Sequence, residues 1–130
     1  MQATYYRDAH GIEAVRAYLD ALPSTPRAII DLQIDRLNDL EETDPPLAFP
    51  HSSQVEGELR ELRCHYGRAL YRILYRRSRN LFILLHIFEK HTKAAPEGDK
   101  AVARQRWTDF ENRMNASPRR PPRPAGRDAP

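Results

Sequence analysis

Arginine side chains recur between residues 59 and 93, and they are the groups in this chain best suited to chemistry. The stretch holds nine lysine or arginine residues and only two acidic ones, whereas residues 1–58 hold four basic and eleven acidic residues. A guanidinium group donates two parallel hydrogen bonds to a phosphate and stays charged at any physiological pH. We therefore predict an anion-binding surface here. Nucleic acid, an acidic protein and a membrane surface are all compatible with this charge pattern.

Two of these arginines, Arg63 and Arg72, are expected to lie opposite each other in a hairpin. A two-residue turn at Gly67 and Arg68 gives this register. Two like charges directly across a strand pair are unfavourable, so a carboxylate or a bound anion must offset them, and Glu61 is the nearest internal candidate. In a ribonuclease, such a pair would stabilise the pentacovalent phosphorane. The alternative is a set of ordinary sheet arginines in ion pairs.

The same register predicts which face of the hairpin packs into the core. On that face, apolar and aromatic side chains stand opposite each other; they are Leu62 with Ile73, Cys64 with Tyr71, and Tyr66 with Ala69. Alternate tyrosines in a strand are typical of a core, although they could also stack on bases.

A second group of candidate functional residues follows the most apolar strand. Lys90, His91 and Lys93 lie where that strand ends, and His91 could act as a general acid or base near neutral pH or simply face solvent. His86, within the strand, is either a hydrogen-bonded core residue or a catalytic group.

The elements that must position these residues can be predicted from periodicity and breakers. Residues 3–7 form a short strand, and apolar residues at helical spacing indicate helices over residues 11–22, from Thr25 to about residue 42, and over 97–114. Residues 43–57 contain three prolines and are expected to form a loop. Three strands follow, at residues 58–66, 69–77 and 80–89. The order β-α-α-β-β-β-α predicts a small α+β domain, with the helices on one side of an antiparallel sheet.

Composition limits the possible domain organisation, cofactors and location of the protein. Residues 1–116 are expected to form one domain, and residues 117–130, rich in proline and arginine, a disordered basic tail that either adds RNA affinity or is inert. The single cysteine, Cys64, excludes an internal disulfide, and no Cys/His spacing indicates a metal or a cofactor. The longest apolar run is too short to cross a bilayer and the first residues lack the apolar core of a signal peptide, so we expect a cytoplasmic protein without a membrane partner.

Two motifs together resemble a known family. The first comprises Glu61-Leu62-Arg63, Gly67, Tyr71-Arg72 and Leu74-Tyr75; the second comprises Leu84-Leu85-His86, Phe88, Lys90, Thr92 and Pro96. Over residues 4–114 the chain resembles the phage-derived HigB-like branch of the RelE/ParE toxin superfamily, which belongs to type II toxin–antitoxin systems.

The resemblance implies a RelE-like α+β fold and a metal-independent endoribonuclease. Such an mRNA interferase cuts mRNA on the ribosome, inhibits translation and is neutralised by an antitoxin of helix-turn-helix type. Carried over by motif position, Arg63 and Arg72 would hold the phosphate, and Lys90 with His91 or Lys93 would lie by the scissile bond. The implied RNA-contacting set is Arg60, Arg68, His86 and Lys93.

The resemblance leaves two points open. Relatives often carry a second lysine where this chain has His91, so the general acid and base remain unassigned. The superfamily also includes ParE-like toxins that inhibit DNA gyrase without catalysis, and an inactive toxin-like co-repressor is a third alternative.

Overall fold

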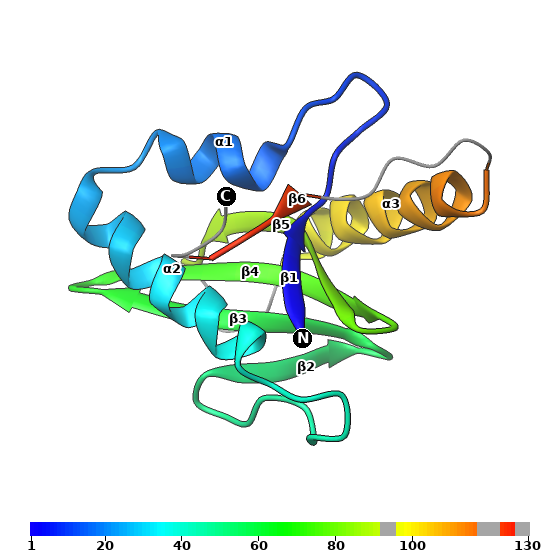
Figure 1. The fold of residues 1–130 in the computed structure, drawn as a ribbon. Coiled ribbons are helices and arrows are strands. Elements are labelled where there is room, and N and C mark those ends of the chain that lie inside the picture. The colour runs from blue at the N-terminus through cyan, green and yellow to red at the C-terminus, as the bar shows by residue number, and fades with distance from the viewer. Residues whose placement is uncertain (92–95, 117–122, 127–130) are drawn as a thin grey trace.

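The computed structural model describes residues 1–91, 96–116 and 123–126 of the 130-residue chain. In these ranges the elements follow the order β1-α1-α2-β2-β3-β4-β5-α3-β6 (Figure 1). The helices are α1 Ala14–Asp20, α2 Ser24–Asn38 and α3 Glu97–Met114. The strands are β1 Gln2–Tyr5, β2 Ser52–Glu56, β3 Leu59–Tyr66, β4 Ala69–Ser78, β5 Leu81–Glu89 and β6 Arg123–Pro124. The predicted α+β class is confirmed, and β2 and β6 are added to the predicted order.

The sheet is mixed, whereas a purely antiparallel sheet was expected. Its strand order is β2-β3-β4-β5-β1-β6, and β1 pairs with β5 in parallel while the other neighbours are antiparallel. The parallel pair arises because the chain leaves β1 through α1 and α2, enters the sheet at its far edge, and reaches β1 again through the β2–β5 meander.

Helices cover both faces of the sheet: the N-terminal helices α1 and α2 pack on one face, as expected, whereas α3 packs on the other and does not share their side. The helices α1 and α2 share one core with one set of strand residues, which includes Leu62, Ile73 and Leu84. The helix α3 packs on the other face through Trp107 and Phe110. The strand β5 is apolar on both faces, and its two apolar faces can be buried only if both are covered.

The hairpin of β3 and β4 has the predicted register, with Arg63 opposite Arg72 and Cys64 opposite Tyr71. Gly67 has a φ of +58° in the turn, a conformation that glycine adopts without steric cost. The predicted core face is also confirmed for Leu62, Cys64, Tyr71 and Ile73. Tyr66 differs, because it lies at the end of the hairpin and is exposed.

Helix α1 is shorter than expected. It begins at Ala14, not at residue 11, because the Asp8 carboxylate accepts hydrogen bonds from the backbone N–H groups of His10 and Ile12. This arrangement competes with helix formation, and it leaves Ile12 exposed.

Strand β2 lies inside the segment that was expected to be a loop. It pairs with β3 at the edge of the sheet, and its buried Ser52 hydroxyl lies 2.6 Å from the Tyr75 hydroxyl. The strand is short and polar, and a β-bulge interrupts its pairing between Gln54 and Glu56. These are common features of edge strands, and in a single sequence they look like a loop.

A β-bulge divides β5 into two parts. Leu74 pairs with His86, but the next residue, Tyr75, pairs with Leu84, so Leu85 has no partner on β4. As a result, Leu85 packs in the α3 core while its neighbour His86 also contacts α3. The extra residue therefore reverses, from the bulge onward, the alternation of β5 side chains between the two faces of the sheet.

Part of the expected disordered tail forms β6. The Ala125 N–H donates to the Ala3 carbonyl at 2.7 Å, and the Asn38 side chain donates to the Ala125 carbonyl at 2.9 Å. Ala125 is buried, and a Cβ on Gly126 would lie 2.2 Å from the Asp35 carboxylate. For residues 123–126 the expectation of disorder is therefore corrected; the rest of the tail lies outside the described residues.

Candidate functional site

Three strands carry polar side chains in register on the face that α3 only partly covers. The pairing of β3, β4 and β5 aligns their residues in three rows, which we call the cationic grid; the rows are Glu61–Leu74–His86, Arg63–Arg72–Phe88 and His65–Leu70–Lys90. Side chains opposite each other in such rows have Cβ atoms about 4.5–5.5 Å apart. The hairpin register and the β5 bulge together bring these groups onto one surface.

Arg63 and Arg72 share the carboxylate of Glu61. Nη1 of Arg63 lies 3.3 Å and Nε of Arg72 lies 3.7 Å from the same atom, Oε1 of Glu61. Arg72 is only 2% exposed and Glu61 only 6%, so these charges interact with little screening. Ser53 from β2 donates a hydrogen bond to the same oxygen. The expectation that Glu61 offsets the arginine pair is confirmed.

One carboxylate does not satisfy two guanidinium groups. Among the residues that the structure describes, the buried Nε atoms of Arg63 and Arg72 have no hydrogen-bond acceptor. Burial and the charge of Arg63 lower the pKa of Arg72, and Glu61 opposes this shift. Unpaired buried donors and an uncompensated charge are costly, and an anion that reaches them would relieve both costs.

His65 is a candidate that the sequence alone did not single out. It lies two residues after Arg63 on the same strand face, and that spacing was the available signal. His65 is exposed, and partial desolvation, followed by the charges of Arg72 and Arg63, lowers its pKa. The imidazole is therefore neutral at neutral pH and able to accept a proton.

The lowered pKa makes a testable contribution to stability. Above the pKa of the unfolded chain, His65 is neutral in both states and contributes nothing. As the pH falls below about 6.5, the unfolded state takes up the proton more readily, so the folded state loses stability until the folded pKa is passed. We expect the unfolding free energy of His65→Gln to fall less than that of the wild type between about pH 7.5 and pH 5. Urea unfolding of both proteins at the two pH values measures this. An equal decrease in the free energy of unfolding for both proteins would contradict the placement of His65 beside the two arginines.

His86 is held by α3. Its Nε2 lies 2.6 Å from Oδ1 of Asp99, and Nη1 of Arg106 lies 3.4 Å from its Nδ1. Arginine can only donate, so this arrangement places the imidazole proton on Nε2. The ring also stacks on Phe88, with the centroids 5.8 Å apart. These contacts support a structural role: His86 links the grid to α3.

The basic residues after β5 are only partly brought to the grid. The backbone N–H of Lys90 donates to the Leu70 carbonyl, and strand alternation directs the Lys90 side chain to the same face as Phe88. His91 is exposed and lies 3.3 Å from the Glu89 carboxylate. Arg68 is exposed in the hairpin turn, and Lys93 lies outside the described residues.

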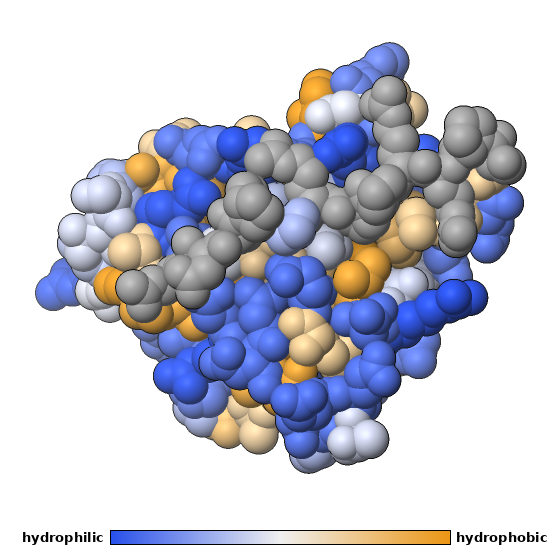
Figure 2. Space-filling model, in the orientation of Figure 1, coloured by the Kyte–Doolittle hydropathy of each residue, from blue (hydrophilic) through white to orange (hydrophobic). Residues whose placement is uncertain are grey.

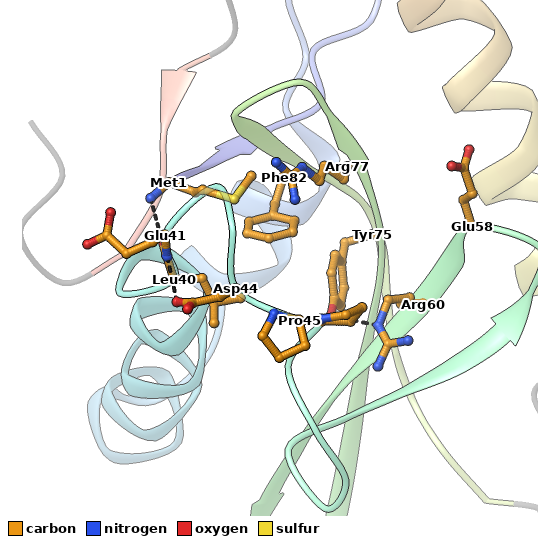
Figure 3. A pocket seen from close by; sticks show the side chains of 11 residues that line it. Met1, Leu40, Glu41, Asp44, Pro45, Glu58, Arg60, Tyr75, Arg77 and Phe82 are labelled. Carbon is orange, nitrogen blue, oxygen red and sulfur yellow. Dashed lines mark hydrogen bonds between the residues drawn. The ribbon is translucent and has the colours of Figure 1, made fainter.

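Arg60 lies on the opposite face of the sheet from Arg63. It lines a small pocket of about 80 Å³ with Tyr75 and Arg77 (Figure 3). Its guanidinium donates to the Leu47 carbonyl and to the Tyr75 hydroxyl. The structure therefore separates Arg60 from the cationic grid, although the resemblance placed it among the RNA-contacting residues.

Other chemistries find less support in the part of the chain that is described. No group of three or more His, Cys, Asp or Glu side chains there could hold a metal ion. None of the described helices combines the length and apolar character needed to cross a bilayer. Cys64 is buried, and burial raises its pKa to about 12, which disfavours a thiolate nucleophile.

Comparison with known proteins matches the chain to a family. A family model described as "Phage derived protein Gp49-like" (DUF891) matches residues 17–108, a range that includes every position of the cationic grid. A search of curated proteins finds no match to the chain.

Proposed function

Because this chain belongs to the Gp49-like family of phage-derived proteins, a RelE/ParE-like toxin family, we propose that it is the toxin of a type II toxin–antitoxin system. We further propose that it belongs to the HigB-like branch and acts as a ribosome-dependent mRNA endonuclease that inhibits translation. Its proposed partners are mRNA on the ribosome and a helix-turn-helix antitoxin.

The observation that carries this proposal is the Arg63–Arg72 pair over a single carboxylate. Two guanidinium groups lie side by side with buried Nε donors that lack acceptors in the described structure. A phosphodiester supplies acceptor oxygens and negative charge in the geometry that guanidinium groups bind well. Fold and family alone would not select this chemistry.

The geometry supports a metal-independent transesterification. The 2′-oxygen attacks the adjacent phosphorus while the bond from phosphorus to the 5′-oxygen breaks, which yields a 2′,3′-cyclic phosphate and a 5′-hydroxyl. We assign His65 as the base that accepts the 2′-hydroxyl proton, because it lies on the same strand face as Arg63 and Arg72 and its imidazole is neutral at neutral pH. Arg63 and Arg72 stabilise the charge on the phosphorane, and the ammonium group of Lys90 donates a proton to the leaving 5′-oxygen, which becomes the 5′-hydroxyl.

The face of the molecule in Figure 2 is largely hydrophilic, with small apolar patches. It is seen from the side of α1 and α2. Acidic residues occur along α2 and just after it; Asp39 is exposed, whereas Asp35 is half-buried and contacts Asn38. A solvated helix face explains the exposed acidic residues, and we therefore assign no antitoxin surface to them.

A cleavage map in a purified translation system tests the proposed function. The protein is added to a reporter mRNA with and without ribosomes, and primer extension locates the cuts. We expect cuts only when ribosomes are present. Intact mRNA in every reaction, together with growth arrest and gyrase-dependent DNA damage in cells, would reject the endonuclease and favour the ParE-like alternative.

A further inference from the structure

Phe49 is an exposed aromatic residue beside the cationic grid. Among the large apolar side chains that the structure describes it is the most exposed, at 70%. The guanidinium carbon of Arg63 lies 4.9 Å from the centroid of its ring. A single exposed apolar side chain is common on protein surfaces; the informative feature is that this ring is held against a guanidinium group of the cationic grid.

Backbone hydrogen bonds fix the position of this ring. The N–H groups of His51 and Ser52 both donate to the Ala48 carbonyl, which closes a turn around Phe49. The Arg63 N–H donates to the His51 carbonyl at 2.8 Å, which ties that turn to β3. The ring is thus attached to the strand that carries Arg63, and it does not depend on a long loop for its placement.

The guanidinium covers only part of the ring, and most of the Phe49 surface remains open to solvent. A flat aromatic surface beside a cation is the arrangement by which proteins stack unpaired bases while they hold the neighbouring phosphate. Arg63 contributes one half of the arginine pair, so a base on Phe49 would belong to a nucleotide next to the bound phosphate.

We propose that Phe49 is a stacking platform for a base of single-stranded RNA adjacent to the phosphate held by Arg63 and Arg72. This inference rests on the proposed function for the identity of the phosphate. It adds the form of the substrate: a base can reach Phe49 only after it leaves its own helix, so duplex RNA is excluded.

The test uses the full chain and a short single-stranded oligonucleotide that carries 2-aminopurine as its fluorescent base. Every sugar of this oligonucleotide is 2′-deoxy, so cleavage cannot occur. Stacking quenches 2-aminopurine fluorescence. We expect wild type and Phe49→Trp to quench the probe, and Phe49→Leu, which stays apolar but is not flat, to bind roughly 5- to 100-fold more weakly. Tyr66→Leu is the matched control, because Tyr66 is another exposed aromatic residue and lies at the end of the hairpin.

The outcomes separate this inference from the proposed function. Equal quenching by Phe49→Leu and wild type, or equal quenching of the annealed duplex, would overturn the stacking platform even if mRNA is cut. Failure of the wild type to quench the single strand would also overturn it. Phe49-dependent quenching without any mRNA cleavage on ribosomes would support the platform and reject the endonuclease.

Discussion

Replacing Arg72 with lysine is expected to lower ribosome-dependent mRNA cleavage by roughly 100- to 1000-fold while the protein stays folded. Lysine keeps the positive charge but loses the planar fork that binds two phosphate oxygens at once. Lysine is a sharper test than alanine, because Arg72 is almost fully buried and alanine would leave a cavity beside the Glu61 carboxylate. The measurement is the primer-extension assay, with circular dichroism and antitoxin co-purification as checks on the fold.

Arg76→Lys is the matched control for this variant. Arg76 lies on the same strand, but its guanidinium stacks on Trp107 and pairs with Glu58. We expect cleavage close to that of the wild type. If Arg72→Lys cut mRNA at the wild-type rate, the arginine pair would not be the phosphate-binding site, whatever the activity of the protein.

Replacing Glu61 with glutamine is expected to lower the free energy of unfolding by about 3–5 kcal/mol, because it leaves two neighbouring guanidinium groups without their shared carboxylate. Glu58→Gln is the control: Glu58 also pairs with an arginine, but its side chain is 79% exposed, and such pairs contribute about 0–1 kcal/mol. Urea unfolding of the two variants and the wild type measures the difference.

The same variant reports on anion binding. Inorganic phosphate should raise the unfolding midpoint of Glu61→Gln more than that of the wild type, because a bound anion replaces the missing carboxylate. If phosphate has the same small effect on both proteins, the arginine pair is closed to ligands and Glu61 has only a structural role.

The centre of the candidate site could be predicted from sequence because it depends on local rules. A glycine at the hairpin turn sets the register, and the register alone places Arg63, Arg72 and Glu61 together. The second strand pair was harder, since the β5 bulge leaves no mark in the alternation of a strand that is apolar on both faces. Arg60 was grouped with Arg63 by charge and motif, although strand alternation sends residues three positions apart to opposite faces of the sheet.

The features that were missed depend on contacts between distant segments. The edge strands β2 and β6 carry serine, glutamine, arginine and proline, whose local preferences favour loops, and pairing with a longer strand overrides these preferences. The lowered pKa of His65 depends first on burial and then on the charges of two arginines on two strands. Phe49 was hidden in a proline-containing segment, and only the pairing of His51 with Arg63 brings it to the site.

The unpaired Leu85 also bears on how the gene for this chain can vary. Loss of its single codon would restore regular pairing between β4 and β5 and keep the start of β5 in place. Every side chain after it would keep its present face, because Leu85 and His86 both face α3, and Phe88 and Lys90 would therefore stay in the cationic grid. An in-frame deletion here would remove one apolar residue from the α3 core but leave His86, Phe88 and Lys90 on the grid face, so the bulge is a place where the length of β5 can change without a change of face.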